Sequence, residues 1–307
     1  MSSSPDTPGA AGTGDGPGPP PGGQADPPGH AAPPVCPRHP DRVSYVRCQR
    51  CERPTCPQCQ RPAAVGIHCV DCVRADPAVR ARTVVGAVHG GGRPLLTQAL
   101  LVVLAVVYVL QLVVPGVTST LGFSPVVSQS QPWRFLTAGL VHSPSFPFHL
   151  LLNGVALWVV GRELEPVLGR ARLGAVLGVS TLASSVGVLW LTSPQSPAWA
   201  GLTVGASGAV FGLLGAGVVL DARRGAPFGR QLAVLGVLAV AGFLLPGISW
   251  QGHVGGLVGG LASAAVLLLA PRARRQAWQV AGLALVVLGL VGLVLLRWAL
   301  VPDGLLF

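Results

Sequence analysis

Long apolar runs separated by short polar segments make up most of the chain from residue 95 onward. Each run is near or above the roughly 20 residues that an α-helix needs to cross the hydrocarbon core of a bilayer, although the fourth and fifth runs are short. The pattern therefore predicts seven membrane-spanning helices. Their expected ranges are 95–114, 148–166, 172–192, 205–221, 231–246, 252–270 and 277–300.

Arginine is concentrated in alternate connections: before the first run, and between the second and third, the fourth and fifth, and the sixth and seventh. Basic residues gather on the cytoplasmic side of membrane proteins. We therefore expect a multi-pass protein of the plasma membrane with its N-terminus in the cytoplasm and its C-terminus outside. The arginines concerned are Arg80, Arg82, Arg93, Arg162, Arg170, Arg172, Arg223, Arg224, Arg230, Arg272, Arg274 and Arg275.

Composition agrees with a membrane protein, because 50% of the residues are hydrophobic and only 10% are charged, against roughly 25% charged in an ordinary soluble domain. The net charge is +10, and all 21 basic residues are arginines. From residue 95 onward they lie mostly in short gaps between apolar runs, and they form no continuous patch, so no nucleic-acid partner is expected. The first 35 residues are rich in Pro, Gly, Ala and Ser and should be disordered; they lack the pattern of a cleavable signal peptide.

All seven cysteines lie between Cys36 and Cys72, in the order C-x2-H-x8-C-x2-C-x4-C-x2-C-x9-C-x2-C. Each short pair can present two donors to a tetrahedral zinc ion, so four pairs predict two closed structural sites. An odd number of cysteines on a reducing, cytoplasmic side argues against disulfides. His68 is a spare donor beside Cys69, which leaves the last ligand set open. A module that holds a single zinc ion is the alternative.

The order of the pairs resembles the B-box family of zinc modules, in which alternate pairs interleave. That resemblance implies two ligand sets. The first is Cys36, His39, Cys56 and Cys59, and the second is Cys48, Cys51, Cys69 and Cys72. Since no open coordination position is evident, we expect the module to be structural or to bind a cytoplasmic protein.

A few polar residues interrupt the apolar body, and such residues are costly in a bilayer and thus functional candidates. They are His142, His149, Asn153, Ser207 and His253. Ser207 in the fourth run and His253 at the start of the sixth lie at similar shallow depth, because both runs enter from the outside. Alone, Ser207 would be interpreted as a small polar residue that packs between helices.

Small residues recur at steps of four beside both groups. They are Gly208 and Gly212 in the fourth run, and Gly252, Gly256 and Gly260 in the sixth. Such faces let helices approach closely, which would bring a serine hydroxyl within reach of a histidine base. The acidic residues lie at other depths, so we expect a Ser-His dyad without a carboxylate.

His149 and Asn153 are spaced i, i+4 and share one face of the second run near the outer surface. Together with the backbone N–H of Ser207 they could stabilise the oxyanion of an acyl-transfer reaction. An ordinary hydrogen bond within a helix bundle is the alternative for this pair.

At these residues the chain resembles the rhomboid intramembrane serine proteases, over about residues 95 to 270. The matching segments are WR at 133–134, HLLLN at 149–153, GASG at 205–208 and GHVGGLVGG at 252–260. The resemblance implies Ser207 as nucleophile, His253 as general base, and His149, Asn153 and the Ser207 amide as oxyanion donors. It also implies that Gly205 shapes the turn before the serine, and that His142 and Glu165 are structural.

The expected fold is an all-α membrane protein: a rhomboid-like six-helix bundle with a seventh C-terminal transmembrane helix, preceded by a small zinc-stabilised domain. The segments are a disordered tail (1–35), a B-box-like module (36–73), a linker (74–94), the protease core (95–270) and the seventh helix with a short tail (271–307).

The expected function is cleavage of transmembrane segments of membrane proteins, within the lipid bilayer near its outer face. Catalysis would need no cofactor, and zinc would be confined to the N-terminal module. The alternative is a catalytically inactive rhomboid-like protein that binds membrane clients, although both Ser207 and His253 are present. A small transporter would explain the intramembrane histidines but not the WR and GASG segments.

Overall fold

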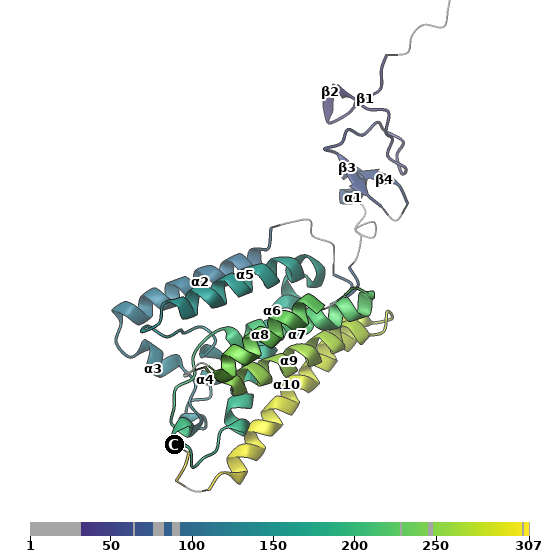
Figure 1. Ribbon diagram of the computed structural model, residues 1–307. Helices are drawn as coiled ribbons and strands as arrows, with labels where there is room; N and C mark the ends of the chain where they lie inside the picture. The colour runs from purple at the N-terminus through teal and green to yellow at the C-terminus, as the bar shows by residue number, and fades with distance from the viewer. Residues whose placement is uncertain are drawn as a thin grey trace, which may run out of the picture. The chain divides into compact units, whose positions relative to one another are not determined.

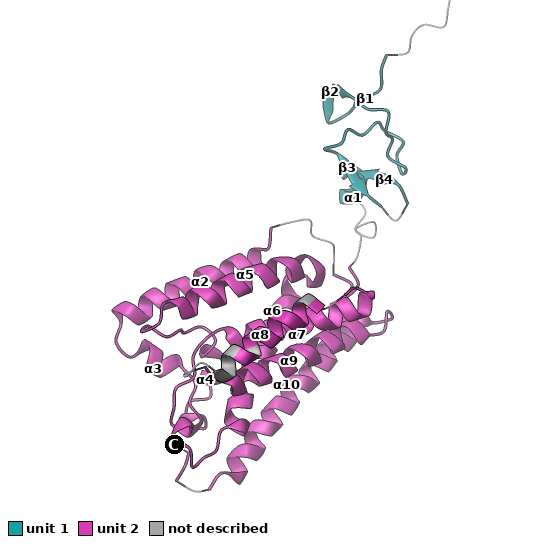
Figure 2. Cartoon of the chain, viewed as in Figure 1, with its two compact units in different colours: residues 1–75 teal, residues 76–307 magenta. Residues whose placement is uncertain are grey.

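The computed structural model describes residues 32–63, 65–75, 83–87, 93–227, 229–244, 248–302 and 304–306. The chain divides into two compact units, Met1–Ala75 and Asp76–Phe307 (Figure 2). Most of the tail expected at 1–35 and much of the linker expected at 74–94 lie outside the described residues.

The first unit is a small module of short strands. Strand β1 (Val35–Cys36) pairs antiparallel with β2 (His39–Val43), and β3 (Gln60–Pro62) pairs antiparallel with β4 (Ile67–Cys69). Helix α1 (Val70–Ala75) follows directly. These strands restrict the all-α prediction to the second unit. The buried residues are mostly cysteines, and so small an apolar core is the kind that a metal usually supplements.

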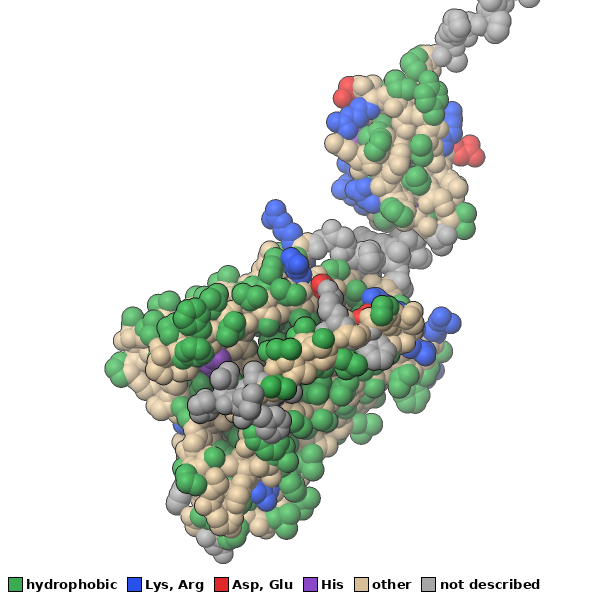
Figure 3. All heavy atoms as spheres, in the orientation of Figure 1, with side chains coloured by type: hydrophobic (Ala, Val, Ile, Leu, Met, Phe, Trp, Pro, Cys, Tyr) green, Lys and Arg blue, Asp and Glu red, His purple; other side chains and the backbone are tan. Residues whose placement is uncertain are grey.

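The second unit is helical (Figure 1), and each of the seven apolar runs forms a helix in the part of the chain that is described. The helices are α2 (Leu95–Val113), α5 (Phe148–Leu168), α6 (Arg170–Leu191), α7 (Ser207–Arg224), α8 (Gly229–Leu244), α9 (Trp250–Leu269) and α10 (Arg275–Leu300). Hydrophobic side chains cover much of the face seen in Figure 3, as expected of a surface in contact with lipid.

Four of these helices, α2, α6, α9 and α10, are both long and apolar enough to cross a membrane. The other three differ for identifiable reasons. Helix α8 has 16 residues, and α5 and α7 each carry three charged side chains near their carboxyl ends. All seven runs therefore form helices, but only four of these described helices are long and apolar enough, by length and composition, to cross a membrane.

Short elements fill the connections on either side of α5 and α6. Helix α3 (Val117–Leu121), the turn η2 (Pro125–Val127) and α4 (Arg134–Thr137) lie between α2 and α5, and η3 (Pro197–Trp199) precedes α7. The buried guanidinium of Arg134 donates from Nη1 to the carbonyl of Gly122 at 2.6 Å. Phe123 and Thr203 form a backbone bridge, so the first loop is joined to the segment that leads into α7.

Glycines allow α9 to pack tightly against α7. A methyl group at Gly256 would collide with the carbonyl oxygen of Gly208, and one at Gly260 would collide with that of Gly212. The close approach expected from small residues at steps of four is therefore present. Helix α6 also takes part, because a methyl group at Gly255 would collide with the carbonyl of Ala183.

Glu165 of α5 caps the amino end of α2. Its carboxylate accepts hydrogen bonds from the backbone N–H groups of Leu96 (2.9 Å) and Thr97 (2.8 Å) and from the Thr97 hydroxyl (2.8 Å). A carboxylate suits this position because the first N–H groups of a helix lack intrahelical partners and carry partial positive charge. Glu165 thus joins two helices, in agreement with the structural role expected for it.

The last helix, α10, is anchored near both ends. At its amino end, the buried amide of Gln279 donates to the carbonyls of Leu267 (2.8 Å) and Val85 (3.1 Å) and accepts from Nε of Arg172 (2.8 Å). At its carboxyl end, Arg297 donates to two carbonyls at the end of α6. Through Val85, part of the segment expected as a linker is packed against the helical unit.

Candidate active site and metal sites

Ser207 and His253 lie side by side at the amino ends of two helices. Ser207 is the first residue of α7 and His253 is the fourth residue of α9. The imidazole Nε2 of His253 lies 2.9 Å from the hydroxyl oxygen of Ser207. This is the contact that a histidine base needs to activate a serine nucleophile.

Ser207 begins its helix, whereas the apolar run that contains it was expected to begin at residue 205. The difference matters chemically because the first N–H groups of a helix point away from it without intrahelical partners. The amide of Ser207 is therefore at the end of α7 where an anion is favoured.

The imidazole of His253 is held by stacking. The ring of Phe211 lies parallel to it, with centroids 4.2 Å apart and planes at 11°. Nδ1 of His253 is buried and has no hydrogen-bond partner within the described residues. Stacking on Phe211 therefore orients the base, and no described carboxylate bonds to Nδ1 as it would in a triad.

His149 presents an N–H donor to the space beside Gly205 and Ser207. Its Nδ1 accepts a hydrogen bond from the backbone N–H of Ser143 at 3.3 Å, so the neutral ring carries its proton on Nε2. A methyl group at Gly205 would lie 2.7 Å from that Nε2 and 3.8 Å from the Ser207 hydroxyl oxygen. The absence of a side chain at Gly205 leaves room between a proton donor and the serine.

Asn153 lies one turn after His149 on α5, and one N–H group of its side-chain amide is already hydrogen-bonded. Nδ2 donates to the backbone carbonyl of His149 at 2.8 Å. An amide nitrogen has two N–H groups, so one remains for a further acceptor. The oxyanion contact that was expected for Asn153 depends on that second N–H.

His142 supports the turn before Ser207. It is fully buried, and its Nε2 accepts from the backbone N–H of Ala206 at 3.4 Å. Its ring lies edge-on to that of His149, with centroids 5.1 Å apart. Gly205 has a φ of +123°, in the region that favours glycine. These contacts agree with the structural role expected for His142 and with a turn shaped by Gly205.

Two residues of this site, Phe211 and Gln111, were not expected from the sequence. Phe211 lies one helical turn after Ser207, a spacing that sequence alone did not distinguish from ordinary packing. Gln111 is a polar residue inside the first apolar run, which is a signal of function in a membrane helix. Its side chain contacts the backbone of His142.

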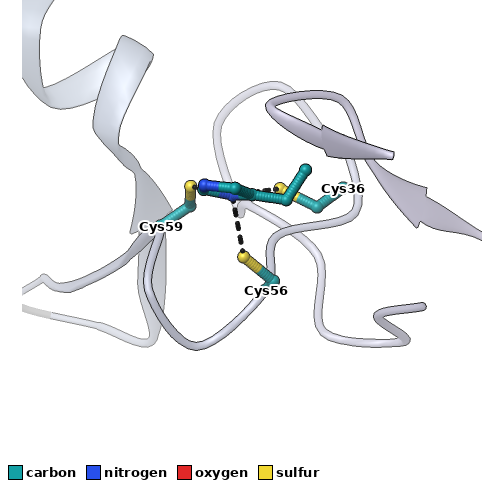
Figure 4. A group of neighbouring side chains, drawn as sticks. Cys36, Cys56 and Cys59 are labelled. Carbon is teal, nitrogen blue, oxygen red and sulfur yellow. Dashed lines mark hydrogen bonds between the residues drawn. The ribbon is translucent and has the colours of Figure 1, made fainter. Parts of the chain in front are cut away.

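The first unit groups its eight expected donors into two sets of four. In each set the ligand atoms all lie within 4.8 Å of one another. The sets are Cys36, His39, Cys56 and Cys59, and Cys48, Cys51, Cys69 and Cys72, which is the interleaved arrangement implied by the B-box resemblance. The side chain of Cys36 approaches those of Cys56 and Cys59, which come from one short turn (Figure 4). His68 belongs to neither set.

The spacing within each set fits a tetrahedral zinc ion. Bond lengths of about 2.3 Å to sulfur and 2.05 Å to nitrogen place tetrahedral sulfur atoms about 3.8 Å apart and sulfur about 3.5 Å from nitrogen. Nδ1 of His39 lies 3.3 Å from the sulfurs of Cys56 and Cys59, and the sulfurs of Cys51 and Cys69 are 3.7 Å apart. A disulfide needs about 2.05 Å, and all seven cysteines are free.

An arginine favours the thiolate form in the second set. Nε of Arg53 donates to the sulfur of Cys51 at 3.3 Å and lowers the pKa of this thiol to about 6. In contrast, burial raises the pKa of the Cys72 thiol to about 12. A bound cation would deprotonate such a thiol outright, so this buried donor set suits a metal better than four neutral thiols.

Comparisons with known proteins identify the helical unit. The family model described as Rhomboid domain matches residues 129–270. The chain is 30% identical over 193 residues to the rhomboid protease GluP of Bacillus subtilis (strain 168), covering 59% of this chain and 36% of GluP. It is 30% identical over 144 residues to the rhomboid protein YdcA of the same bacterium, covering 45% of this chain and 69% of YdcA.

A plant protein is similar to the same extent. RHOMBOID-like protein 5 of Arabidopsis thaliana is 31% identical over 153 residues, covering 48% of this chain and 48% of its own length. The chain therefore belongs to the rhomboid family and is a membrane protein. It spans about a third of the length of GluP and about half that of the plant relative. Ser207, His253, His149 and Asn153 all fall inside the matched residues.

Proposed function

We propose that the protein is an intramembrane serine endopeptidase that works by a Ser207–His253 dyad. The observation that carries this proposal is the 2.9 Å contact between Nε2 of His253 and the hydroxyl of Ser207. Membership of a family that includes named proteases supports it. Each relative's activity belongs to that relative, and the reaction proposed for this chain rests on its own residues.

The reaction would proceed in two stages. Nε2 of His253 removes the proton from Ser207 as Oγ attacks a peptide carbonyl, and the same proton then passes to the leaving amine as the C–N bond breaks. Water attacks the resulting ester, gives its proton to His253, and releases the acid as Ser207 regains its hydroxyl. During both attacks the carbonyl oxygen becomes negative.

Three donors are proposed for this oxyanion: Nε2–H of His149, the second amide N–H of Asn153 and the backbone N–H of Ser207. The space beside Gly205 supports the first, because it opens directly onto Nε2 of His149. The position of Ser207 at the start of α7 supports the third. Asn153 is supported only by its place one turn from His149.

The substrates proposed are transmembrane segments of other membrane proteins. A helix in lipid hides its carbonyls in backbone hydrogen bonds, so a segment that unwinds readily would be preferred. We place the protein in the plasma membrane with seven spans, which the apolar runs support. The distribution of arginine supports an N-terminus in the cytoplasm. Ser207 and His253 would then lie near the outer face, where cleavage is proposed.

The N-terminal module is proposed to bind two structural zinc ions, one in each set of four donors. Distances close to those of tetrahedral coordination support this. All four positions in each set are filled by side chains, which suits a structural rather than a catalytic ion. A cytoplasmic protein is the proposed partner of the folded module.

The function is tested by cleavage of a reporter transmembrane segment in reconstituted vesicles. Ser207→Ala and His253→Ala should each lower the cleavage rate by about 1,000-fold or more. Ser263→Ala, the same change on α9 at a hydroxyl bonded to the Gly259 carbonyl, is the matched control and should retain activity. Full activity in either dyad variant would refute the mechanism, and no cleavage by the wild type would favour an inactive, client-binding relative.

A further inference from the structure

Gln111 is a polar side chain inside a membrane helix, and it is buried. It lies near the carboxyl end of α2, in the apolar segment VYVLQLVV, and is 8% exposed. An amide in such a place is costly unless its hydrogen bonds are satisfied. The identity of its partners therefore indicates what the residue does.

The amide of Gln111 holds both backbone polar groups of one residue, His142. Its Nε2 donates to the carbonyl of His142 at 2.7 Å, and its Oε1 accepts from the N–H of His142 at 2.9 Å. The second N–H of Nε2 goes to the hydroxyl of Thr118 at 2.7 Å. Both donors of the amide are therefore used.

His142 needs this support because it lies in an irregular segment between α4 and α5, where no helix or sheet pairs its backbone. Its imidazole accepts from the N–H of Ala206, next to the nucleophile. The following residue, Ser143, donates its N–H to Nδ1 of His149. The peptide held by Gln111 thus contacts the serine turn on one side and the proposed oxyanion donor on the other.

We propose that Gln111 is a positioning residue for the reaction. By fixing the backbone of His142 and Ser143, it places the His142 imidazole beneath the turn at Ala206 and keeps the proton of His149 on Nε2. This inference rests on the proposed function, since it assigns Gln111 to the assembly of that same site. Gln111 itself does not touch the reacting atoms.

A pair of substitutions separates positioning from simple packing. Gln111→Leu keeps most of the volume but breaks both bonds to His142, and should lower kcat by about 10- to 100-fold with little change in KM. In Gln111→Glu, a protonated carboxyl still accepts from one backbone group and donates to the other, whereas an ionised carboxylate cannot donate. The protonated form of this variant should therefore support the reaction, and the ionised form should not.

The decisive readout is the rate of Gln111→Glu divided by that of the wild type, measured between about pH 5 and 8. The wild type contains the same imidazoles in and beside this site, those of His142, His149 and His253. The effect of their titration on the rate therefore largely cancels when the two rates are divided. The ratio should fall as pH rises, while that of Gln111→Leu should stay low and flat. A ratio for Gln111→Glu that is as low and flat as that of Gln111→Leu, or wild-type kcat in Gln111→Leu, would overturn the inference.

Thr118→Val is the matched control, because it removes the third bond of Gln111 and leaves both bonds to His142. Its kcat should remain within about twofold of the wild type if only the His142 contacts matter, and a loss as large as that of Gln111→Leu would contradict the proposal. Labelling of Ser207 by a fluorophosphonate probe distinguishes failure of the proposed protease function from failure of the proposed role of Gln111. Absence of Ser207-dependent labelling in the wild type refutes the proposed function, whereas normal labelling with a low, flat ratio for Gln111→Glu refutes only the role of Gln111.

Discussion

Gly205 and His149 approach so closely that a methyl group at residue 205 would lie 2.7 Å from Nε2 of the histidine. Gly205→Ala should therefore displace the His149 ring and strain a backbone whose φ is +123°. We expect cleavage to fall by about 100-fold, because misplacement of roughly 1 Å at a reacting group has this effect. The measurement is the initial rate on the reporter segment, together with labelling by a serine-directed probe.

Gly225→Ala is the control for backbone strain. Gly225 also has a positive φ, +67°, but a methyl group there meets nothing within 4 Å. Its cost should be about 1–2 kcal/mol of stability with catalysis of the folded protein unchanged. Equal loss of activity in both variants would mean that strain, and not the contact with His149, explains the effect.

The contact between α7 and α9 makes a second prediction. Gly256→Ala forces a methyl group against the Gly208 carbonyl, so the helices must separate and the Ser207–His253 contact must lengthen. We expect destabilisation of about 1–3 kcal/mol and a lower cleavage rate. Gly292→Ala on α10, where a methyl group meets nothing within 4 Å, should change neither quantity. Unfolding in detergent and cleavage at a fixed temperature measure the two effects, and unchanged values for Gly256→Ala would contradict the packing argument.

The cap on α2 predicts a stability effect with little direct effect on chemistry. Glu165→Leu removes three hydrogen bonds to a buried carboxylate and should lower the free energy of unfolding by about 3 kcal/mol. Glu165→Gln should lose less, since its carbonyl oxygen still accepts. Glu163→Gln, on the exposed side of the same helix, should stay within about 0.5 kcal/mol. The order of the three midpoints in denaturant tests this, and a Glu165→Leu midpoint equal to the control would refute it.

The two proposed metal sites predict the number of zinc ions bound by each chain. Elemental analysis of the full chain should find close to two zinc ions, and replacing both Cys48 and Cys51 by serine should remove at least one of them. His68→Ala should retain two, because His68 belongs to neither donor set. A preparation without bound metal would refute the sites, and loss of an ion in His68→Ala would place this histidine in the second set after all.

Several features of the site were predictable because they depend on the type of side chain and on its expected depth in the membrane. Ser207 and His253 stood out as polar residues beside glycines at steps of four, and the pairing of the cysteines followed from a resemblance. Phe211 was not predictable, since an aromatic residue one turn from a serine is common in any packed helix. The serines of α6 that face Gly208 and Gly212 were not foreseen either, because the sequence indicated an approach of two helices and not which third helix packs against both.

The sequence by itself determined the helices of the membrane unit, the two groups of soft donors and the chemical types present near one depth. These follow from local hydrophobicity and short spacings, which tertiary packing does not change. Only the tertiary structure decided that Gln111 of α2 holds His142 and that Ser143 sets the proton on His149. These contacts join residues 31 and 6 positions apart through an irregular segment, and no periodicity encodes such a segment. Its conformation is selected by the hydrogen bonds that a buried backbone must make.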